Sequence, residues 1–211
     1  MPEPTTERDR IIDAAYRCLQ ETDGATVSVA DILAVAGLGT RAFYRHFGSK
    51  DDLVLAMFRR DSERVIAELE SAAAAAASPA EALRGYVSGM MRLVSDRRRM
   101  RRVLVMTSDE ARRARGYGAE LRRSQATQEA TVARILAQGR DDGTFPLVRD
   151  ARADARSIRA AVGQAFDEQV TGLAPVTADE AAEEVADFVL RAIGYSASPA
   201  ADVLYSDAFD T

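Results

Sequence analysis

Several residue types are nearly missing from this sequence, and each shortage removes a class of function. Cys18 is the only cysteine, so no disulfide framework can form within the chain. His46 is the only histidine, and no nucleophile or metal-ligand cluster lies at a suitable spacing from it. The sequence also lacks a phosphate-binding loop and a nucleophile elbow. We therefore expect a protein that is not an enzyme and that holds no metal or cofactor.

Long apolar runs are missing too. The longest run of small apolar residues, Ala72–Ala77, is far shorter than the roughly 18 residues that a membrane-spanning helix needs. The first seven residues include two glutamates and lack the basic and then apolar order of a signal peptide. We expect a cytoplasmic protein without a membrane partner. The length of 211 residues fits one modest domain, or a small domain fused to a larger one.

The charge is unevenly distributed. The net charge of −5 argues against a nucleic-acid partner if it is taken as a whole. However, residues 92–123 contain eleven arginines against four acidic residues, whereas acidic residues dominate after residue 178. The run Arg97–Arg102 is either a solvated helix face paired with acidic neighbours, or a surface that attracts an anionic ligand or the DNA backbone. Net charge therefore does not exclude DNA binding.

The spacing of apolar residues predicts helices throughout, with glycine and proline between helix-length blocks. Ser28 and Ser49 are suitable N-caps, and Gly37 is a suitable helix end. Residues 196–211 lack a clear period and are expected to form a loose tail. The predicted fold class is all-α, with about nine helices near residues 6–22, 29–36, 39–46, 50–77, 79–95, 97–114, 117–140, 150–172 and 177–194.

The second and third predicted helices are short and are joined by a turn of about four residues, which is the pattern of a helix-turn-helix. Phe43 and Phe47 are four residues apart, so both can face the core. That arrangement turns Thr40, Arg41 and Tyr44 outward. In a helix-turn-helix the second helix enters the major groove, where Arg41 is suited to bidentate contact with guanine and Thr40 can contact a base or a phosphate.

Other polar residues around this motif are candidate phosphate ligands. Ser28 offers a hydroxyl and a helix N-terminus. Tyr44 could instead pack on Phe47, and His46 could simply end its helix. We expect DNA phosphates to be contacted by Tyr44, Arg45, His46 and Lys50.

Residues 11–53 closely resemble the DNA-binding domain of the TetR (tetracycline repressor) family. The resemblance depends on residues 11–15, 28–33 and 36–38, and above all on the segment 43–53, which reads Phe-Tyr-Arg-His-Phe-Gly-Ser-Lys-Asp-Asp-Leu. Three positions depart from the family, which often has Ser or Thr where Gly39 stands, Gly where Arg41 stands and Thr where Ala42 stands. The resemblance implies a helix-turn-helix domain over residues 1–52 and a helical ligand-binding and dimerisation domain over residues 53–195, joined by a long fourth helix.

The resemblance also implies a ligand cavity and a dimer interface made by the last two long helices. Small and apolar residues along one face of each of those helices independently favour close helix packing. The expected pocket residues, which could instead be plain core, are Tyr86, Met90, Met106, Tyr117, Gln125, Gln164 and Asp167. The expected interface residues are Ile158, Val162, Phe166, Val185, Phe188, Val189 and Ile193.

The interpretation favoured by these features is a dimeric repressor that binds double-stranded operator DNA and is released by a small hydrophobic effector. A dimer would present its two recognition helices to half-sites roughly 34–36 Å apart. Two alternatives remain open. One is a helical DNA-binding regulator that responds to a protein partner or to no ligand, and the other is an all-helical enzyme.

Overall fold

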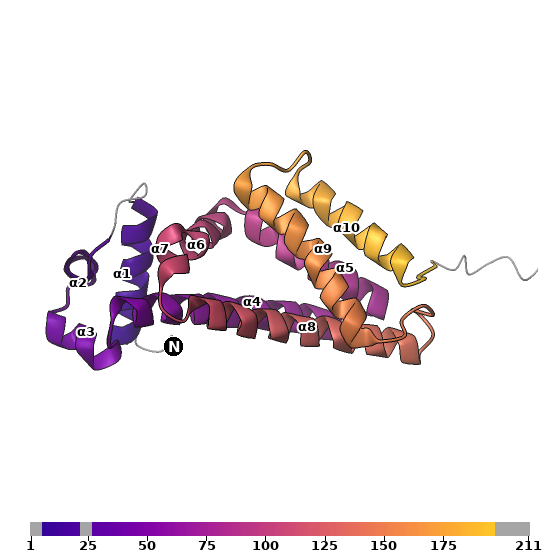
Figure 1. Ribbon diagram of the computed structural model, residues 1–211, viewed down its shortest axis with the longest axis horizontal. Helices are drawn as coiled ribbons and strands as arrows, with labels where there is room; N and C mark the ends of the chain where they lie inside the picture. Colours follow the sequence, from indigo (N-terminus) through magenta and orange to yellow (C-terminus); the bar gives the residue numbers. More distant parts are fainter. Residues whose placement is uncertain (1–5, 22–26, 197–211) are drawn as a thin grey trace, which may run out of the picture.

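The computed structural model describes residues 6–21 and 27–196, and these residues form ten helices and no strand (Figure 1). The predicted all-α fold is confirmed. The first three helices gather at one end of an elongated molecule, and α4 and α8 run side by side along its length. Helices α5, α9 and α10 pack together at the other end. All but the first residue of the predicted tail, 196–211, lie outside the described residues.

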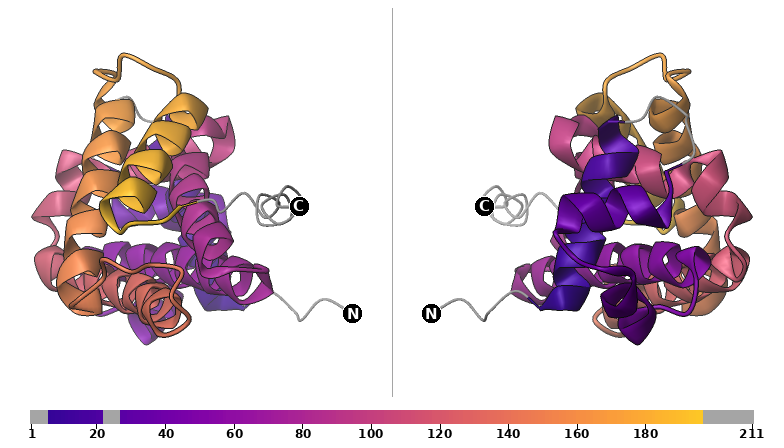
Figure 2. Two further views of the ribbon diagram at one scale, coloured as in Figure 1. Left: turned by 90° about the vertical axis from the view of Figure 1, so that its right-hand side faces the viewer. Right: turned by 90° about the vertical axis from the view of Figure 1, so that its left-hand side faces the viewer.

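The N-terminal end consists of α1 (Glu7–Glu21), α2 (Val29–Ala36) and α3 (Thr40–His46). Figure 2 (right) shows these helices at the end of the molecule that faces the viewer. Gly37 has a φ of 63°, a left-handed conformation that glycine adopts without strain, and it ends α2 abruptly. Only residues 37–39 separate α2 from α3, so the turn is one residue shorter than predicted.

Helix α4 (Lys50–Ala75) links the two ends of the molecule. It begins at Ser49, whose hydroxyl accepts a hydrogen bond from the Asp52 amide at 3.1 Å. Its 26 residues correspond to about 39 Å at 1.5 Å per residue. The first turns of α4 bury Leu53–Phe58 in one core with α1, α2 and α3, whereas Leu69 belongs to a second core farther along.

The rest of the chain forms six helices. The prediction of one helix over residues 97–114 is wrong, because the chain breaks at Ser108. The Ser108 hydroxyl donates to the Val105 carbonyl at 2.8 Å and accepts from the Ala111 amide at 3.3 Å, so it ends one helix and caps the next. The six helices are α5 (Pro79–Ser95), α6 (Arg97–Thr107), α7 (Asp109–Arg113), α8 (Tyr117–Asp141), α9 (Ala151–Thr171) and α10 (Ala178–Ala192).

Two hydrophobic cores result from this arrangement. The first core joins α1, α2, α3 and the start of α4 to residues of α6, α7 and the start of α8. The second core is formed by α5, α8, α9 and α10, with Tyr86, Leu83 and Met91 among its fully buried side chains. The first core therefore packs the helix-turn-helix end of the molecule against α6 and α7.

Candidate nucleic-acid interface and ligand cavity

Helix α3 presents one apolar face and one free face. Phe43 and Phe47 are buried as predicted, and their ring centroids lie 5.6 Å apart. Thr40, Arg41 and Tyr44 are exposed, and 63% of the surface of Tyr44 is accessible. The Tyr44 ring packs edge-on against Phe43 with a centroid distance of 5.4 Å, and its hydroxyl end is left free to make contacts.

The basic side chains near α3 differ in how they are held. Arg41 makes no hydrogen bond or ion pair with any described residue. By contrast, Arg45 and His46 both contact the Glu7 carboxylate of α1, at 2.8 and 3.1 Å. The hydrogen bond from His46, followed by the charge of Arg45, lowers the pKa of Glu7. Because the Arg45–Glu7 pair is exposed, its net contribution to stability is small and Arg45 can exchange Glu7 for a phosphate.

Ser28 and Lys50 are held by the protein itself. The Ser28 hydroxyl accepts a hydrogen bond from the Asp31 amide at 3.2 Å, and the Ser28 amide donates to the Asp31 carboxylate at 3.0 Å, which together form a capping box. The hydroxyl also donates to the Asp31 carboxylate at 2.6 Å. These hydrogen bonds lower the pKa of Asp31, so a carboxylate occupies the N-terminus of α2. The Lys50 ammonium contacts the Val27 carbonyl and the Glu110 carboxylate of α7. Both residues therefore position the motif before they could contact DNA.

Sequence analysis missed Arg10, which supports the helix-turn-helix from α1. Its Nη2 donates to the Ala36 carbonyl at 2.7 Å, at the C-terminal end of α2. Arginine is a suitable partner for the carbonyls at a helix end. However, the two residues are 26 positions apart, and nothing in the local sequence pairs them.

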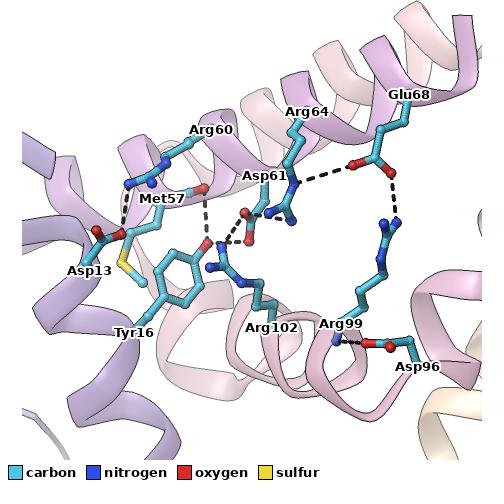
Figure 3. A network of polar contacts seen from close by, with 10 residues as sticks. All are labelled: Asp13, Tyr16, Met57, Arg60, Asp61, Arg64, Glu68, Asp96, Arg99 and Arg102. Carbon is cyan, nitrogen blue, oxygen red and sulfur yellow. Dashed lines mark hydrogen bonds and ion pairs between the residues drawn. The ribbon is translucent and has the colours of Figure 1, made fainter. Parts of the chain in front are cut away.

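A network of polar contacts joins α1, α4 and α6 at the border of the two cores (Figure 3). The Tyr16 hydroxyl donates to the Asp61 carboxylate and lies 3.3 Å from the Met57 carbonyl. Arg102 Nη1 pairs with the same carboxylate at 3.0 Å, and its guanidinium lies 4.6 Å from the centroid of the Tyr16 ring. One carboxylate on α4 thus holds side chains from α1 and α6.

The network continues along α4 and α6. Arg64 lies 3.3 Å from Asp61 and 3.9 Å from Glu68, and Arg99 pairs with Glu68 at 2.7 Å. The arginine run therefore has acidic partners at Arg99 and Arg102, as the first of the two interpretations of the run expects. Three guanidinium groups thus share two carboxylates, Asp61 and Glu68.

Two adjoining cavities lie between the helices, and exposed residues such as Leu121 and Asp167 line their open side. The larger has a volume of about 360 Å³ between α5, α8 and α9, and it is lined by the expected pocket residues Tyr86, Met90, Tyr117, Gln125 and Asp167. The smaller, about 190 Å³, lies between α4, α5, α6 and α8 and is lined by the expected Met106. Gln164 lines neither cavity, because it lies on the exposed face of α9, where its amide donates to Glu168 at 2.8 Å.

The structure revises the predicted dimer surface. The predicted residues Ile158, Val162, Val189 and Ile193 are between 1% and 5% exposed in the single chain, because they pack into the core beneath α9 and α10. Val185 and Phe166 are partly buried against the same core. Phe188 faces outward, with 57% of its surface accessible. The apolar stripes used for the prediction therefore mainly face the core of the same chain.

The described residues contain neither a helix suited to a membrane nor a group of side chains suited to a metal ion. No helix among residues 6–21 and 27–196 is long and apolar enough to cross a membrane. Within the same ranges, no group of three or more His, Cys, Asp or Glu side chains is arranged to hold a metal ion.

Residues 11–57 match the family described as bacterial regulatory proteins, tetR family. An uncharacterized HTH-type transcriptional regulator of Mycobacterium tuberculosis is 33% identical over 88 residues, which are 42% of this chain and 44% of that protein. The HTH-type transcriptional repressor AcnR of Corynebacterium glutamicum is 34% identical over 62 residues, or 29% of this chain and 33% of AcnR. Each match thus spans less than half of the curated relative.

The fold extends the likeness to most of the chain. The transcriptional regulator FadR of Bacillus subtilis, in complex with stearoyl-CoA, superposes with a TM-score of 0.72 over 87% of this chain and 97% of FadR, at 19% identity. The fold and the α2–α3 motif define an all-helical helix-turn-helix protein. Its N-terminal segment, residues 11–57, matches the tetR family of bacterial regulatory proteins.

Proposed function

We propose that this protein is a dimeric transcriptional repressor that binds operator DNA through α3 and is released by a small hydrophobic ligand. The observation that carries the DNA-binding part is the free face of α3. Thr40, Arg41 and Tyr44 lie together on that face, and Arg41 has no partner among the described residues. An unpaired guanidinium on the outer face of this helix is suited to bidentate contact with guanine in the major groove.

The two cavities support the ligand part of the proposal. A regulator that responds to no small molecule is expected to have a filled interior, whereas this chain has a cavity of about 360 Å³ next to a second one. That volume lies within the usual range for small-molecule sites. Among similar proteins, AcnR is named a repressor, and the B. subtilis FadR structure contains stearoyl-CoA.

A dimer would use the outer faces of α9 and α10, which lie side by side in Figure 2 (left). Phe188 is the large apolar side chain of α10 that remains exposed. Phe188→Glu is expected to shift a dimer toward monomer in sedimentation analysis, whereas Leu173→Glu, in the loop after α9, is not. A Phe188→Glu protein that sediments as a dimer would rule out this face.

The DNA-binding part is tested first by selecting preferred sites from random DNA and then measuring anisotropy on the selected site across a salt series. Arg41→Ala is expected to weaken binding to the selected site by about 5- to 100-fold and to relax preference at one base pair. Arg140→Ala is the matched control, because it removes the same charge at the far end of α8, beside Asp141. Equal affinities for Arg41→Ala and the unmodified protein, or no preferred sequence at all, would contradict the proposal.

A further inference from the structure

The Tyr86 hydroxyl is an unpartnered polar group within the second core. The side chain is 1% exposed, and its oxygen has no hydrogen-bond partner among the described residues. Buried hydroxyl groups are nearly always hydrogen-bonded, because they lose their water partners on folding. Tyr86 also lines the larger cavity. An unpartnered donor at a cavity wall is the arrangement expected where a ligand supplies the missing partner.

We propose that Tyr86 anchors the effector, and that the effector is an elongated apolar molecule with a carbonyl or carboxylate oxygen at one end. This inference deepens the proposed ligand response and rests on it. In this arrangement the Tyr86 hydroxyl donates a hydrogen bond to the ligand oxygen. Met90 lines the same cavity, and its flexible thioether chain can adapt its shape to a ligand.

Tyr86 keeps its proton near neutral pH, because burial raises the pKa of Tyr86 to about 12. The neutral phenol has an O–H group to donate, and it carries no charge that would repel an anion. A carbonyl or carboxylate oxygen is therefore a suitable partner for this unused donor.

A second donor lies close to the anchor. Arg159 lines the cavity and pairs through Nε with Glu129 at 2.8 Å. A guanidinium has five N–H donors, and this ion pair uses one of them. Glu129 offsets the charge of Arg159, and Asp167 offsets that of Arg112, so the charges around the cavity balance. The unused N–H groups of Arg159 can donate to a ligand oxygen, whether it belongs to a carbonyl or a carboxylate.

The size and lining of the cavities indicate the length and position of the apolar part of the ligand. About 360 Å³ holds roughly a dozen non-hydrogen atoms, at the ~30 Å³ that each water occupies in the liquid. Met90, Tyr117 and Phe166 line both cavities, so the two spaces adjoin. The smaller space contributes apolar side chains such as Val65 and Leu93. An alkyl chain that starts at Tyr86 is therefore expected to run toward α4 and α6.

The test compares three ligands and two variants by isothermal titration calorimetry on the full chain. Decanoate and 2-undecanone carry an acceptor oxygen and are of about this size, whereas decylamine is cationic and has no such oxygen. The unmodified protein is expected to bind decanoate and 2-undecanone and not decylamine. Tyr86→Phe keeps the ring and is expected to lower both affinities by about tenfold, as the loss of one hydrogen bond predicts.

Tyr117→Phe is the matched control, because Tyr117 also lines the cavity but its hydroxyl already donates to the Met106 carbonyl at 2.9 Å. It is expected to keep the ligand affinities and to melt at a lower temperature. Tyr86→Phe is expected to melt at an equal or higher temperature, since it removes an unpartnered buried hydroxyl. A lower melting temperature for Tyr86→Phe, or unchanged affinities for both ligands, would overturn the proposal.

Failure of the wild-type protein to bind either acceptor ligand would also overturn it. Release of DNA is followed in parallel by anisotropy, so that the two proposals can fail separately. If binding depends on Tyr86 but leaves the DNA bound, the anchor stands and the ligand response fails. If decanoate releases DNA equally from wild type and Tyr86→Phe, the response stands and the anchor is wrong.

Discussion

Replacing Tyr16 by phenylalanine removes one hydroxyl from the contact between α1, α4 and α6. That hydroxyl donates to the Asp61 carboxylate and lies 3.3 Å from the Met57 carbonyl. The ring itself would remain, and with it the contact with the Arg102 guanidinium at 4.6 Å. The substitution therefore tests the hydrogen bond and leaves the packing of α1 in place.

The expected loss of stability follows from the charge of the hydrogen-bond partner, the Asp61 carboxylate. A hydrogen bond to a charged group contributes about 1.5–3 kcal/mol to stability. Asp61 keeps Arg102 at 3.0 Å and Arg64 at 3.3 Å, so the carboxylate is not left unpaired and the larger penalty of a broken buried ion pair does not apply. We expect a loss of about 2 kcal/mol in the free energy of unfolding, or a fall in Tm of about 4–8 °C.

The assay is urea denaturation followed by circular dichroism, with thermal unfolding as a second measurement. Tyr44→Phe is the control, since Tyr44 is largely exposed and its hydroxyl contacts no described residue, and its effect is expected to stay within about 0.5 kcal/mol. If Tyr16→Phe were as stable as this control, the Asp61 contact would not hold α1 and the reasoning would be refuted.

The difference in stability between wild type and Tyr16→Phe is also expected to depend on pH. Burial, and then the neighbouring Asp61 carboxylate, raises the pKa of Tyr16 well above its usual value of 10.0. A raised pKa means that the folded state keeps a proton that the unfolded state loses. The stability from this group is therefore complete below pH 10.0 and declines as the pH rises further. The stability difference between wild type and Tyr16→Phe is expected to narrow above that pH.

Further predictions concern a helix cap and helix packing. Ser28→Ala is expected to cost about 1 kcal/mol in urea denaturation. Ser28 lowers the pKa of Asp31 in the folded state, so the wild type loses stability as the pH falls through 3.8. This acid-induced loss of stability should be smaller in Ser28→Ala. Gly139→Ala should cost about 1–3 kcal/mol, since its Cβ would lie 2.1 Å from the Phe145 ring. Gly85→Ala meets no atom within 4 Å and should gain about 0.5–1 kcal/mol, and a loss there would contradict the packing.

Helix bounds followed from the sequence wherever a capping or breaking residue had one interpretation. Pro79 can begin a helix but cannot lie within one, and α5 starts there. The sequence predicts one helix across Ser108, because serine is tolerated within helices as well as at their N-caps. Two acidic residues follow it, as is common in a first helical turn, so the signal was present but was outweighed by the continuing helical pattern.

The candidate sites were predictable only in part, because a sequence does not say which neighbour covers an apolar stripe. The residues that face outward on α3 follow from the four-residue spacing of Phe43 and Phe47. On α9 and α10 the same logic identified apolar faces but assigned them to a second subunit. Long-range pairs were also beyond reach, such as Lys50 with Glu110, 60 positions apart, or Arg102 with Asp61, 41 positions apart.

Helices α4 and α6 connect the smaller cavity to the helix-turn-helix end of the molecule. Asp61 and Arg102 line the smaller cavity, and they also hold Tyr16 of α1. A ligand shifts a protein between two states only by as much as its affinities for them differ. A ligand chain that entered the smaller cavity would contact the residues that hold α1. If the ligand binds best at one spacing of α4 and α6, it therefore also favours one orientation of the helix-turn-helix. On the proposed function, this shared pair of side chains is where binding energy becomes a change in DNA affinity.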